Sequence, residues 1–105
     1  MKNIVILISG RGSNMQAIVA ADIPNANIAA VLSNRPDAAG LIWAAERGIT
    51  TASLDHKAYG SRLEFDHAMM TLIDKYEPDL VVLAGFMRIL TPDFCRHYEG
   101  KLINI

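Results

Sequence analysis

Residues 4–14 read Ile-Val-Ile-Leu-Ile-Ser-Gly-Arg-Gly-Ser-Asn, and this stretch decides which fold we expect. The first five residues form a continuous apolar run, mostly β-branched, which is typical of a strand buried on both faces of a parallel sheet. A glycine-bearing turn follows and leads into a helix predicted over residues 14–21. The apolar side chains of that helix, Met15, Ile18 and Val19, share one face. A buried strand, a tight turn and an amphipathic helix together begin a β-α-β unit.

The same alternation continues along the chain. Further strands are predicted at residues 27–32, 50–54, 79–84 and 102–105, and further helices at residues 37–47, 61–76 and 92–98. Ser61 and Glu64 have the spacing of a capping box, and Thr91 precedes a proline at a first helical position. The order predicts an α/β fold, a Rossmann-like doubly wound parallel sheet with strand order 3-2-1-4-5, in one domain over residues 1–105.

Composition excludes several classes of protein. The chain has 105 residues, 51% of them hydrophobic and 20% charged, and its net charge is −1. This composition is globular and offers no broad basic surface for nucleic acid or an anionic membrane. No apolar run approaches the ~20 residues needed to span a bilayer. The only cysteine, Cys95, cannot form an intrachain disulfide, so we expect a cytoplasmic protein.

The predicted strand order places three segments beside one another. Ligands of open parallel sheets bind beyond the carboxyl ends of the strands, where the strand order reverses. The segments that leave the first, fourth and fifth strands are residues 9–14, 85–90 and 104–105. We therefore expect these three segments to line one crevice.

The first segment has the features of an anion-binding turn. Its glycines allow the backbone to approach a ligand closely, and the N–H groups at the start of a helix favour an anion such as phosphate. Ser13 and Asn14 add side-chain donors. The turn matches neither a Walker A loop nor the three-glycine dinucleotide fingerprint. Alternatively, the turn is purely structural, and Ser13 caps the helix together with Gln16.

The second segment places an arginine directly after a buried strand. Arg88 suits a ligand carboxylate or phosphate. Its neighbours Phe86, Met87, Ile89 and Leu90 could line an apolar slot for a flat ring. Alternatively, these apolar residues fill the core beneath the loop, and Arg88 forms a surface ion pair.

The third segment presents Asn104 between two isoleucines. An asparagine amide can donate a hydrogen bond to a developing oxyanion without titrating. Alternatively, this side chain satisfies backbone groups at the end of a strand.

The remaining candidate side chains are weaker. His56, His67 and His97 lack metal-ligand spacing, so no metal site is predicted. We expect His67 and His97 to be solvated on helices, and His56 to lie away from the crevice. Cys95 falls inside a predicted helix and is expected to be buried and inert.

Four segments together resemble a known family. Residues 6–14, 31–38, 81–91 and 102–105 are similar, in order and spacing, to the phosphoribosylglycinamide formyltransferases, which are folate-dependent enzymes of purine synthesis. The Gly-Ser-Asn turn separates the chain from formyltetrahydrofolate deformylase and methionyl-tRNA formyltransferase, which share the Met-Arg-Ile-Leu type of loop. The resemblance implies the formyltransferase variant of the Rossmann-like fold.

The resemblance also implies roles for two substrate-binding segments. Gly12, Ser13 and Asn14 match the turn that holds the phosphate of glycinamide ribonucleotide. The residues that match folate-binding positions for the co-substrate 10-formyltetrahydrofolate are Arg62, Met87, Arg88, Ile89 and Leu90. The loop residues would contact the pterin largely through their backbone, and Arg62 would contact the glutamate tail.

The implied reaction is acyl transfer. The ribonucleotide amine attacks the formyl carbon, and Asn104, which matches the catalytic asparagine, donates to the oxygen on which charge develops. The family's catalytic histidine and aspartate match nothing up to Ile105, so residues 1–105 alone are expected to be a truncated and inactive part of a longer enzyme. We expect the fifth strand to be an open edge, favouring self-association or a homodimer. The alternatives are a formyltetrahydrofolate deformylase and a non-catalytic phosphate-binding module.

Overall fold

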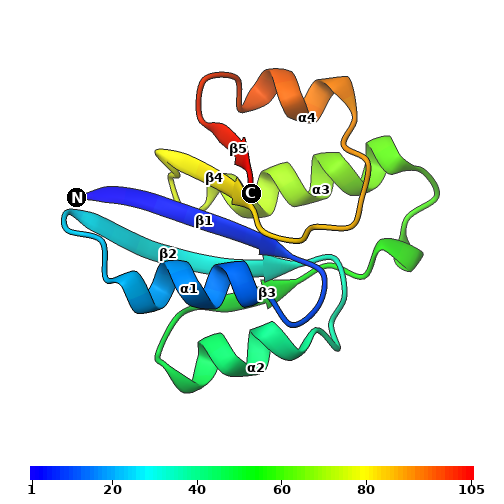
Figure 1. Cartoon of the computed structure of the whole chain (residues 1–105). Helices are drawn as coiled ribbons and strands as arrows, with labels where there is room; N and C mark the ends of the chain where they lie inside the picture. The colour runs from blue at the N-terminus through cyan, green and yellow to red at the C-terminus, as the bar shows by residue number, and fades with distance from the viewer.

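The computed structural model describes all 105 residues and contains one parallel sheet with the predicted strand order, β3-β2-β1-β4-β5. The strands are β1 (Lys2–Ile8), β2 (Ala26–Ser33), β3 (Thr51–Ser53), β4 (Leu80–Leu83) and β5 (Leu102–Asn104). The helices are α1 (Ser13–Ala21), α2 (Ala39–Glu46), α3 (Arg62–Asp74) and α4 (Pro92–His97). Helices α1 and α2 cover one face of the sheet, and α3 and α4 cover the other (Figure 1). The predicted doubly wound architecture is confirmed.

The apolar run in β1 explains why the sheet is covered on both faces. Val5 and Leu7 pack in the core beneath α3 and α4, whereas Ile6 and Ile8 pack beneath α1 and α2. All four side chains are fully buried. Because side chains alternate across a strand, a continuous apolar sequence needs an apolar layer on each side. Strand β1 is therefore the central strand, between β2 and β4.

A local signal accounts for the start of α3. Ser61 accepts a hydrogen bond from the Glu64 amide at 3.1 Å, as the capping-box spacing predicts. In a capping box the Glu64 carboxylate would accept from the amide of Ser61. Here it accepts from the amide of Gly60 instead, one residue earlier in the chain. A short 3-10 helix, His56–Ala58, was not predicted. No helix combines the length and the apolar character that crossing a membrane requires.

Helix α4 corrects one prediction about the cysteine. Cys95 is exposed on this helix, not buried, because the buried face of α4 is formed by Phe94 and Tyr98. His67 and His97 are both exposed, and each bonds a carboxylate across the α3–α4 interface: His67 bonds Asp93, and His97 bonds Asp74.

Tyr98 joins α4 to α3 through a buried hydroxyl. This residue is 1% exposed, and its Oη donates to Asp74 Oδ1 at 2.8 Å. Burial, together with the hydrogen bond and the negative charge of Asp74, raises the pKa of Tyr98 far above its ordinary value. The folded chain therefore binds this proton more tightly than the unfolded chain does.

This pKa difference predicts a loss of stability in alkali. The Tyr98 hydroxyl has a pKa of about 10 in the unfolded chain and a higher pKa in the folded chain. Its contribution to folding stability is therefore complete below about pH 10 and declines as the pH rises above that value. We expect Tyr98→Phe to reduce the fall in unfolding free energy between pH 9 and pH 11. Urea unfolding of parent and variant at both pH values measures the difference, and equal losses in the two proteins would contradict the assignment.

Candidate functional site

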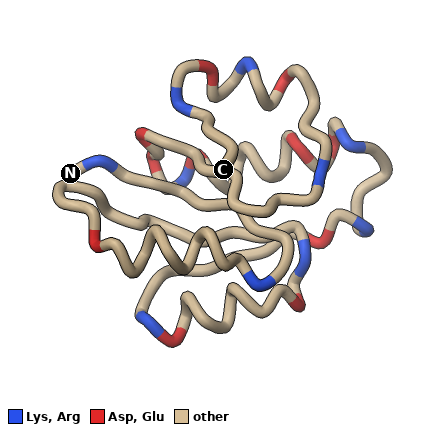
Figure 2. Tube along the Cα trace, viewed as in Figure 1, with Lys and Arg blue, Asp and Glu red and all other residues tan.

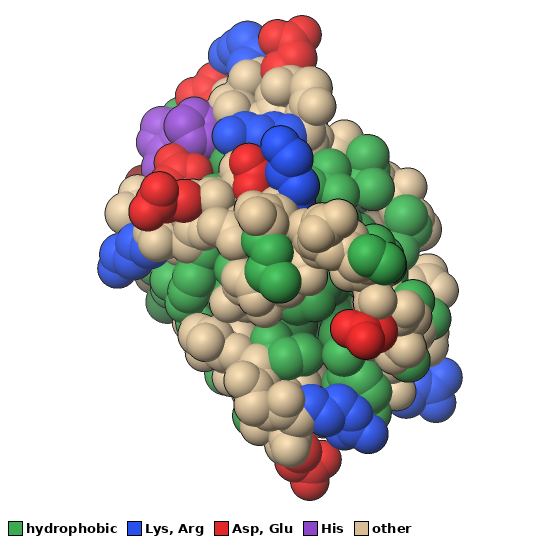
Figure 3. All heavy atoms as spheres, turned by 90° about the vertical axis from the view of Figure 1, so that its left-hand side faces the viewer, with side chains coloured by type: hydrophobic (Ala, Val, Ile, Leu, Met, Phe, Trp, Pro, Cys, Tyr) green, Lys and Arg blue, Asp and Glu red, His purple; other side chains and the backbone are tan.

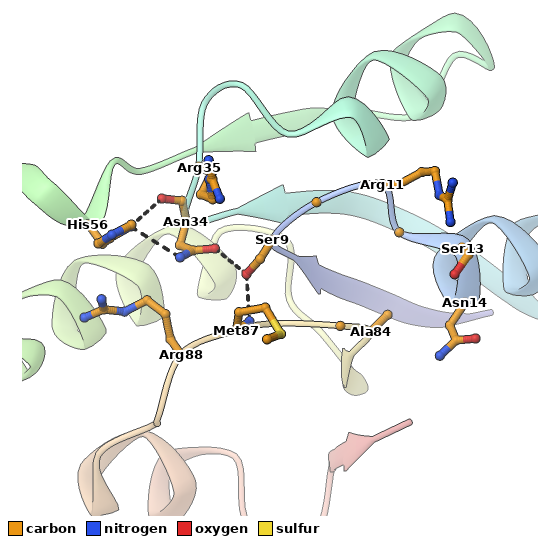
Figure 4. A pocket seen from close by; sticks show the side chains of 13 residues that line it. Ser9, Arg11, Ser13, Asn14, Asn34, Arg35, His56, Ala84, Met87 and Arg88 are labelled. Carbon is orange, nitrogen blue, oxygen red and sulfur yellow. Dashed lines mark hydrogen bonds between the residues drawn. The ribbon is translucent and has the colours of Figure 1, made fainter.

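The carboxyl ends of β1, β2 and β4 open onto one pocket of about 440 Å³ (Figure 4). Its lining residues come from the turns after these strands and from the segment after β3. They are Ser9, Gly10, Arg11, Gly12, Ser13, Asn14, Asn34, Arg35, His56, Ala84, Gly85, Met87 and Arg88. The segments after the first and fourth strands therefore meet, as predicted, but residues 104–105, which were expected to line the same crevice, are not among the lining residues.

The turn after β1 leaves the start of α1 open. Gly12 occupies the N-cap position with a positive φ of 68°, and no side chain caps the helix. Ser13 does not form the alternative cap with Gln16, because the Gln16 side-chain amide donates to the Arg11 carbonyl at 3.1 Å. The N–H groups of the first turn are thus directed at the pocket edge without a side-chain acceptor, as an anion site requires.

Helix α2 supports this turn through a glycine that the sequence analysis did not single out. The amide of Gly40 donates to the Gly10 carbonyl at 3.0 Å. A Cβ at residue 40 would overlap the Ile8 side chain and lie 2.8 Å from the Arg11 carbonyl oxygen. Only glycine lets the start of α2 approach the turn this closely.

Arg88 is an unpaired cation at the pocket wall. Its guanidinium carbon lies 4.7 Å from the centre of the Phe65 ring, and its Nε is buried without a hydrogen-bond partner. The alternative of a surface ion pair is wrong, since the structure contains no carboxylate within salt-bridge distance of Arg88. Its charge is therefore available to a ligand anion.

The pocket is electrostatically positive. Arg11, Arg35 and Arg88 line it, and no acidic residue does, although Arg35 also pairs with Asp37 at 3.5 Å. Figure 2 shows both basic and acidic residues on the side of the molecule where the carboxyl ends of the strands lie, so the positive charge is a property of the pocket lining itself. The opposite side of the molecule, where the amino ends of the strands lie, presents hydrophobic side chains between charges of both signs (Figure 3). An anionic ligand is therefore favoured at the carboxyl edge.

The loop after β4 divides its apolar residues between core and solvent. Phe86 and Leu90 pack against the core, as the alternative interpretation of this loop proposed. Met87 and Ile89 are 81% and 69% exposed. Of the four predicted folate-loop residues, Met87 and Arg88 line the pocket, whereas Ile89 and Leu90 do not.

Two other predicted site residues lie outside the pocket lining. Asn104 pairs with Leu83 in the β4–β5 register, which places it at the carboxyl edge of the sheet, where it is exposed. Arg62 is the first residue of α3 and is also exposed.

The prediction that His56 lies away from the crevice is wrong. His56 lines the pocket because backbone hydrogen bonds hold the segment after β3 beside the end of β2. The Leu54 amide donates to the Ser33 carbonyl at 3.0 Å, and the His56 amide donates to the Asn34 carbonyl at 3.4 Å. The unpredicted 3-10 helix begins at His56, and the carboxylate of Asp55 caps it by accepting from the Lys57 amide at 2.9 Å. No group of three or more histidine, cysteine or acidic side chains converges as a metal site requires.

A buried carboxylate fixes the far end of the loop after β4. Asp66 is 1% exposed, and its Oδ2 accepts from both the amide and the hydroxyl of Thr91 at 2.8 Å. Sequence reasoning missed Asp66 because its partner lies 25 residues away.

We expect Asp66→Ala to destabilise the fold by about 1–3 kcal/mol, because it leaves the Thr91 donors unpaired. Asp66→Asn retains an acceptor oxygen and is the matched control, with a smaller loss. Denaturant unfolding of the parent and the two variants measures the order of their unfolding free energies. An alanine variant as stable as the parent would show that these bonds contribute nothing.

Fold and site define an α/β protein whose open parallel sheet carries a positively charged pocket at its carboxyl edge. The chain belongs to the formyl transferase family, whose sequence profile matches residues 2–105.

Several relatives within this family are similar to the chain. The phosphoribosylglycinamide formyltransferase of Escherichia coli (strain K12) is 52% identical over 98% of this chain and 50% of that protein. The human trifunctional purine biosynthetic protein adenosine-3 is 44% identical over 97% of this chain and 10% of its own length. The solved structure of the Coxiella burnetii phosphoribosylglycinamide formyltransferase has a TM-score of 0.92 at 45% identity, covering 98% of this chain and 50% of that one. The chain thus spans about half the length of its bacterial relatives.

Proposed function

We propose that residues 1–105 form the N-terminal, nucleotide-binding part of a phosphoribosylglycinamide formyltransferase. The full protein would transfer the formyl group of 10-formyltetrahydrofolate to the amine of glycinamide ribonucleotide, a step of purine synthesis in the cytoplasm. One observation carries this proposal beyond family membership. The uncapped turn at Gly12 and the unpaired Arg88 line the same pocket from opposite ends, so one pocket offers both an anion cradle and a free cation (Figure 4).

The turn after β1 is the proposed phosphate site. Gly12, Ser13 and Asn14 would bind the phosphate of glycinamide ribonucleotide through the open N–H groups at the start of α1 and the two polar side chains. All three residues line the pocket, which supports this assignment.

The loop after β4 is the proposed folate site. The amides of Arg88, Ile89 and Leu90 have no partner within the chain, so the main chain there is free to hydrogen-bond a pterin. Met87 would cover the ring, and Arg62 at the start of α3 would pair with the glutamate tail.

Asn104 is the proposed catalytic donor. The amine nitrogen forms a bond to the formyl carbon, the carbon–N10 bond of the folate breaks, and one proton passes from the amine to N10. Negative charge develops on the formyl oxygen, and the side-chain amide of Asn104 would donate to it. The family resemblance assigns the proton transfer to a histidine and an aspartate beyond Ile105.

The test is a formyl-transfer assay of the full-length protein. We expect tetrahydrofolate and formylglycinamide ribonucleotide in equal amounts, with no turnover when the ribonucleotide is omitted. Release of formate without ribonucleotide would identify a deformylase instead. Binding of ribonucleotide with neither product would identify a phosphate-binding module.

A further inference from the structure

Three polar side chains connect the strand ends beneath the pocket. Ser9 follows β1 and Asn34 follows β2, and both are buried, at 5% and 3% exposure. Ser9 Oγ lies 2.6 Å from Asn34 Oδ1, and Asn34 Nδ2 lies 3.3 Å from Nδ1 of His56, after β3 (Figure 4). The amide of Met87, after β4, donates to Ser9 Oγ at 2.7 Å. One chain of hydrogen bonds thus joins segments from four strands.

The structure gives the direction of the first two bonds. The Met87 amide can only donate, so Ser9 Oγ is its acceptor. The Ser9 hydroxyl in turn donates to the side-chain oxygen of Asn34. This orientation turns the Asn34 NH₂ group toward His56.

His56 completes the chain through Nδ1, which lies 3.3 Å from Asn34 Nδ2 and 3.1 Å from the Asn34 carbonyl oxygen. With the ring proton on Nε2, Nδ1 accepts from Asn34 Nδ2; with the proton on Nδ1, it donates to the Asn34 carbonyl. The first tautomer joins the side chains of all three residues in one chain and uses Nδ1 as the acceptor.

The chain ends on the loop that carries Arg88. Met87 supplies the only amide of residues 85–90 that is bonded within the protein. Arg88 follows it directly and rests on Phe65, whose ring meets His56 edge-on at 6.5 Å. Without the bond to Ser9, the loop is held by the packing of Phe86 and Leu90 and by its end at Thr91.

We propose that Ser9, Asn34 and His56 are positioning residues that hold the loop at Met87 and Arg88 in its ligand-binding form. The identification of the ligand as the folate co-substrate depends on the proposed function. The hydrogen-bond chain and its effect on the loop do not depend on it.

Amide exchange in the full-length protein tests the positioning without any assay of activity. We expect Ser9→Ala and His56→Leu to accelerate exchange of the Met87 amide by about tenfold, with amides of the central strand unchanged. His56→Asn places an amide oxygen where Nδ1 lies and should restore slow exchange. Unchanged Met87 exchange in Ser9→Ala and His56→Leu would overturn the proposal, as would uniform acceleration throughout the protein.

Steady-state kinetics test the consequence for the ligand. We expect Ser9→Ala and His56→Leu to raise KM for 10-formyltetrahydrofolate by about tenfold, with KM for the ribonucleotide and kcat within about twofold of the parent. His56→Asn should restore the folate KM. Equal rises in both KM values would overturn the proposal. Absence of formyl transfer in the parent would refute the proposed function. The amide-exchange experiment would still show whether Ser9, Asn34 and His56 hold the loop at Met87.

Discussion

Replacing Asn104 by alanine in the full-length protein is expected to lower kcat for formyl transfer by roughly 10²–10³-fold. This is the typical loss when one donor to a developing oxyanion is removed. Both KM values should change little, because the bond to Asn104 strengthens only as the transition state forms. Within residues 1–105, Asn104 is exposed beside Leu83 at the carboxyl edge of the sheet, so the substitution removes no core contact of this part of the fold.

Two controls separate this catalytic effect from a structural one. Asn104→Asp keeps the size of the side chain, removes the donor and adds a negative charge, so it should be at least as slow as the alanine variant. Urea unfolding of both variants should match the parent. An Asn104→Ala enzyme that keeps most of its kcat would remove Asn104 from the mechanism.

Phe65→Ala is expected to cost about 3–5 kcal/mol of folding stability, the usual range for deleting a buried phenylalanine. The side chain is 1% exposed and packs in the core beneath α3 and α4 with Met69 and Ile73. Its ring also meets Tyr59 edge-on at 5.6 Å and supports the Arg88 guanidinium. Thermal or denaturant unfolding measures the loss.

Phe65→Leu is the matched variant, because it fills much of the same volume without an aromatic face. We expect it to recover most of the stability and to bind the folate co-substrate more weakly than the parent, since Arg88 loses its cation–π contact. If the leucine variant bound the folate as tightly as the parent, the ring would have no part in placing Arg88.

The sheet could be predicted because its signals are local and strong. The apolar runs at residues 4–8 and 80–83 are too continuous for any position other than a central, doubly covered strand. Once these two strands are neighbours, right-handed crossovers leave few places for the others. The meeting of the Gly12 turn with Arg88 follows from that order alone.

The parts that could not be predicted depend on contacts between distant residues. Gly40 matters only because α2 approaches the Gly10 turn, and nothing in its own neighbourhood marks that approach. His56 reaches the pocket because it bonds Asn34, and this contact between residues 22 positions apart leaves no local signal in the sequence. Cys95 was misplaced because helical periodicity did not determine which face of α4 meets the core.

Titration of the isotope-labelled full-length protein with glycinamide ribonucleotide tests the central claim most directly. Backbone amide shifts report which part of the fold meets the ligand. We expect the largest shifts at Gly12, Ser13 and Asn14, followed by shifts at residues 85–90 when a folate is added. The account would be contradicted if saturation with the ribonucleotide left the amide shifts of Gly12–Asn14 unchanged and instead changed the shifts of amides at the amino ends of the strands.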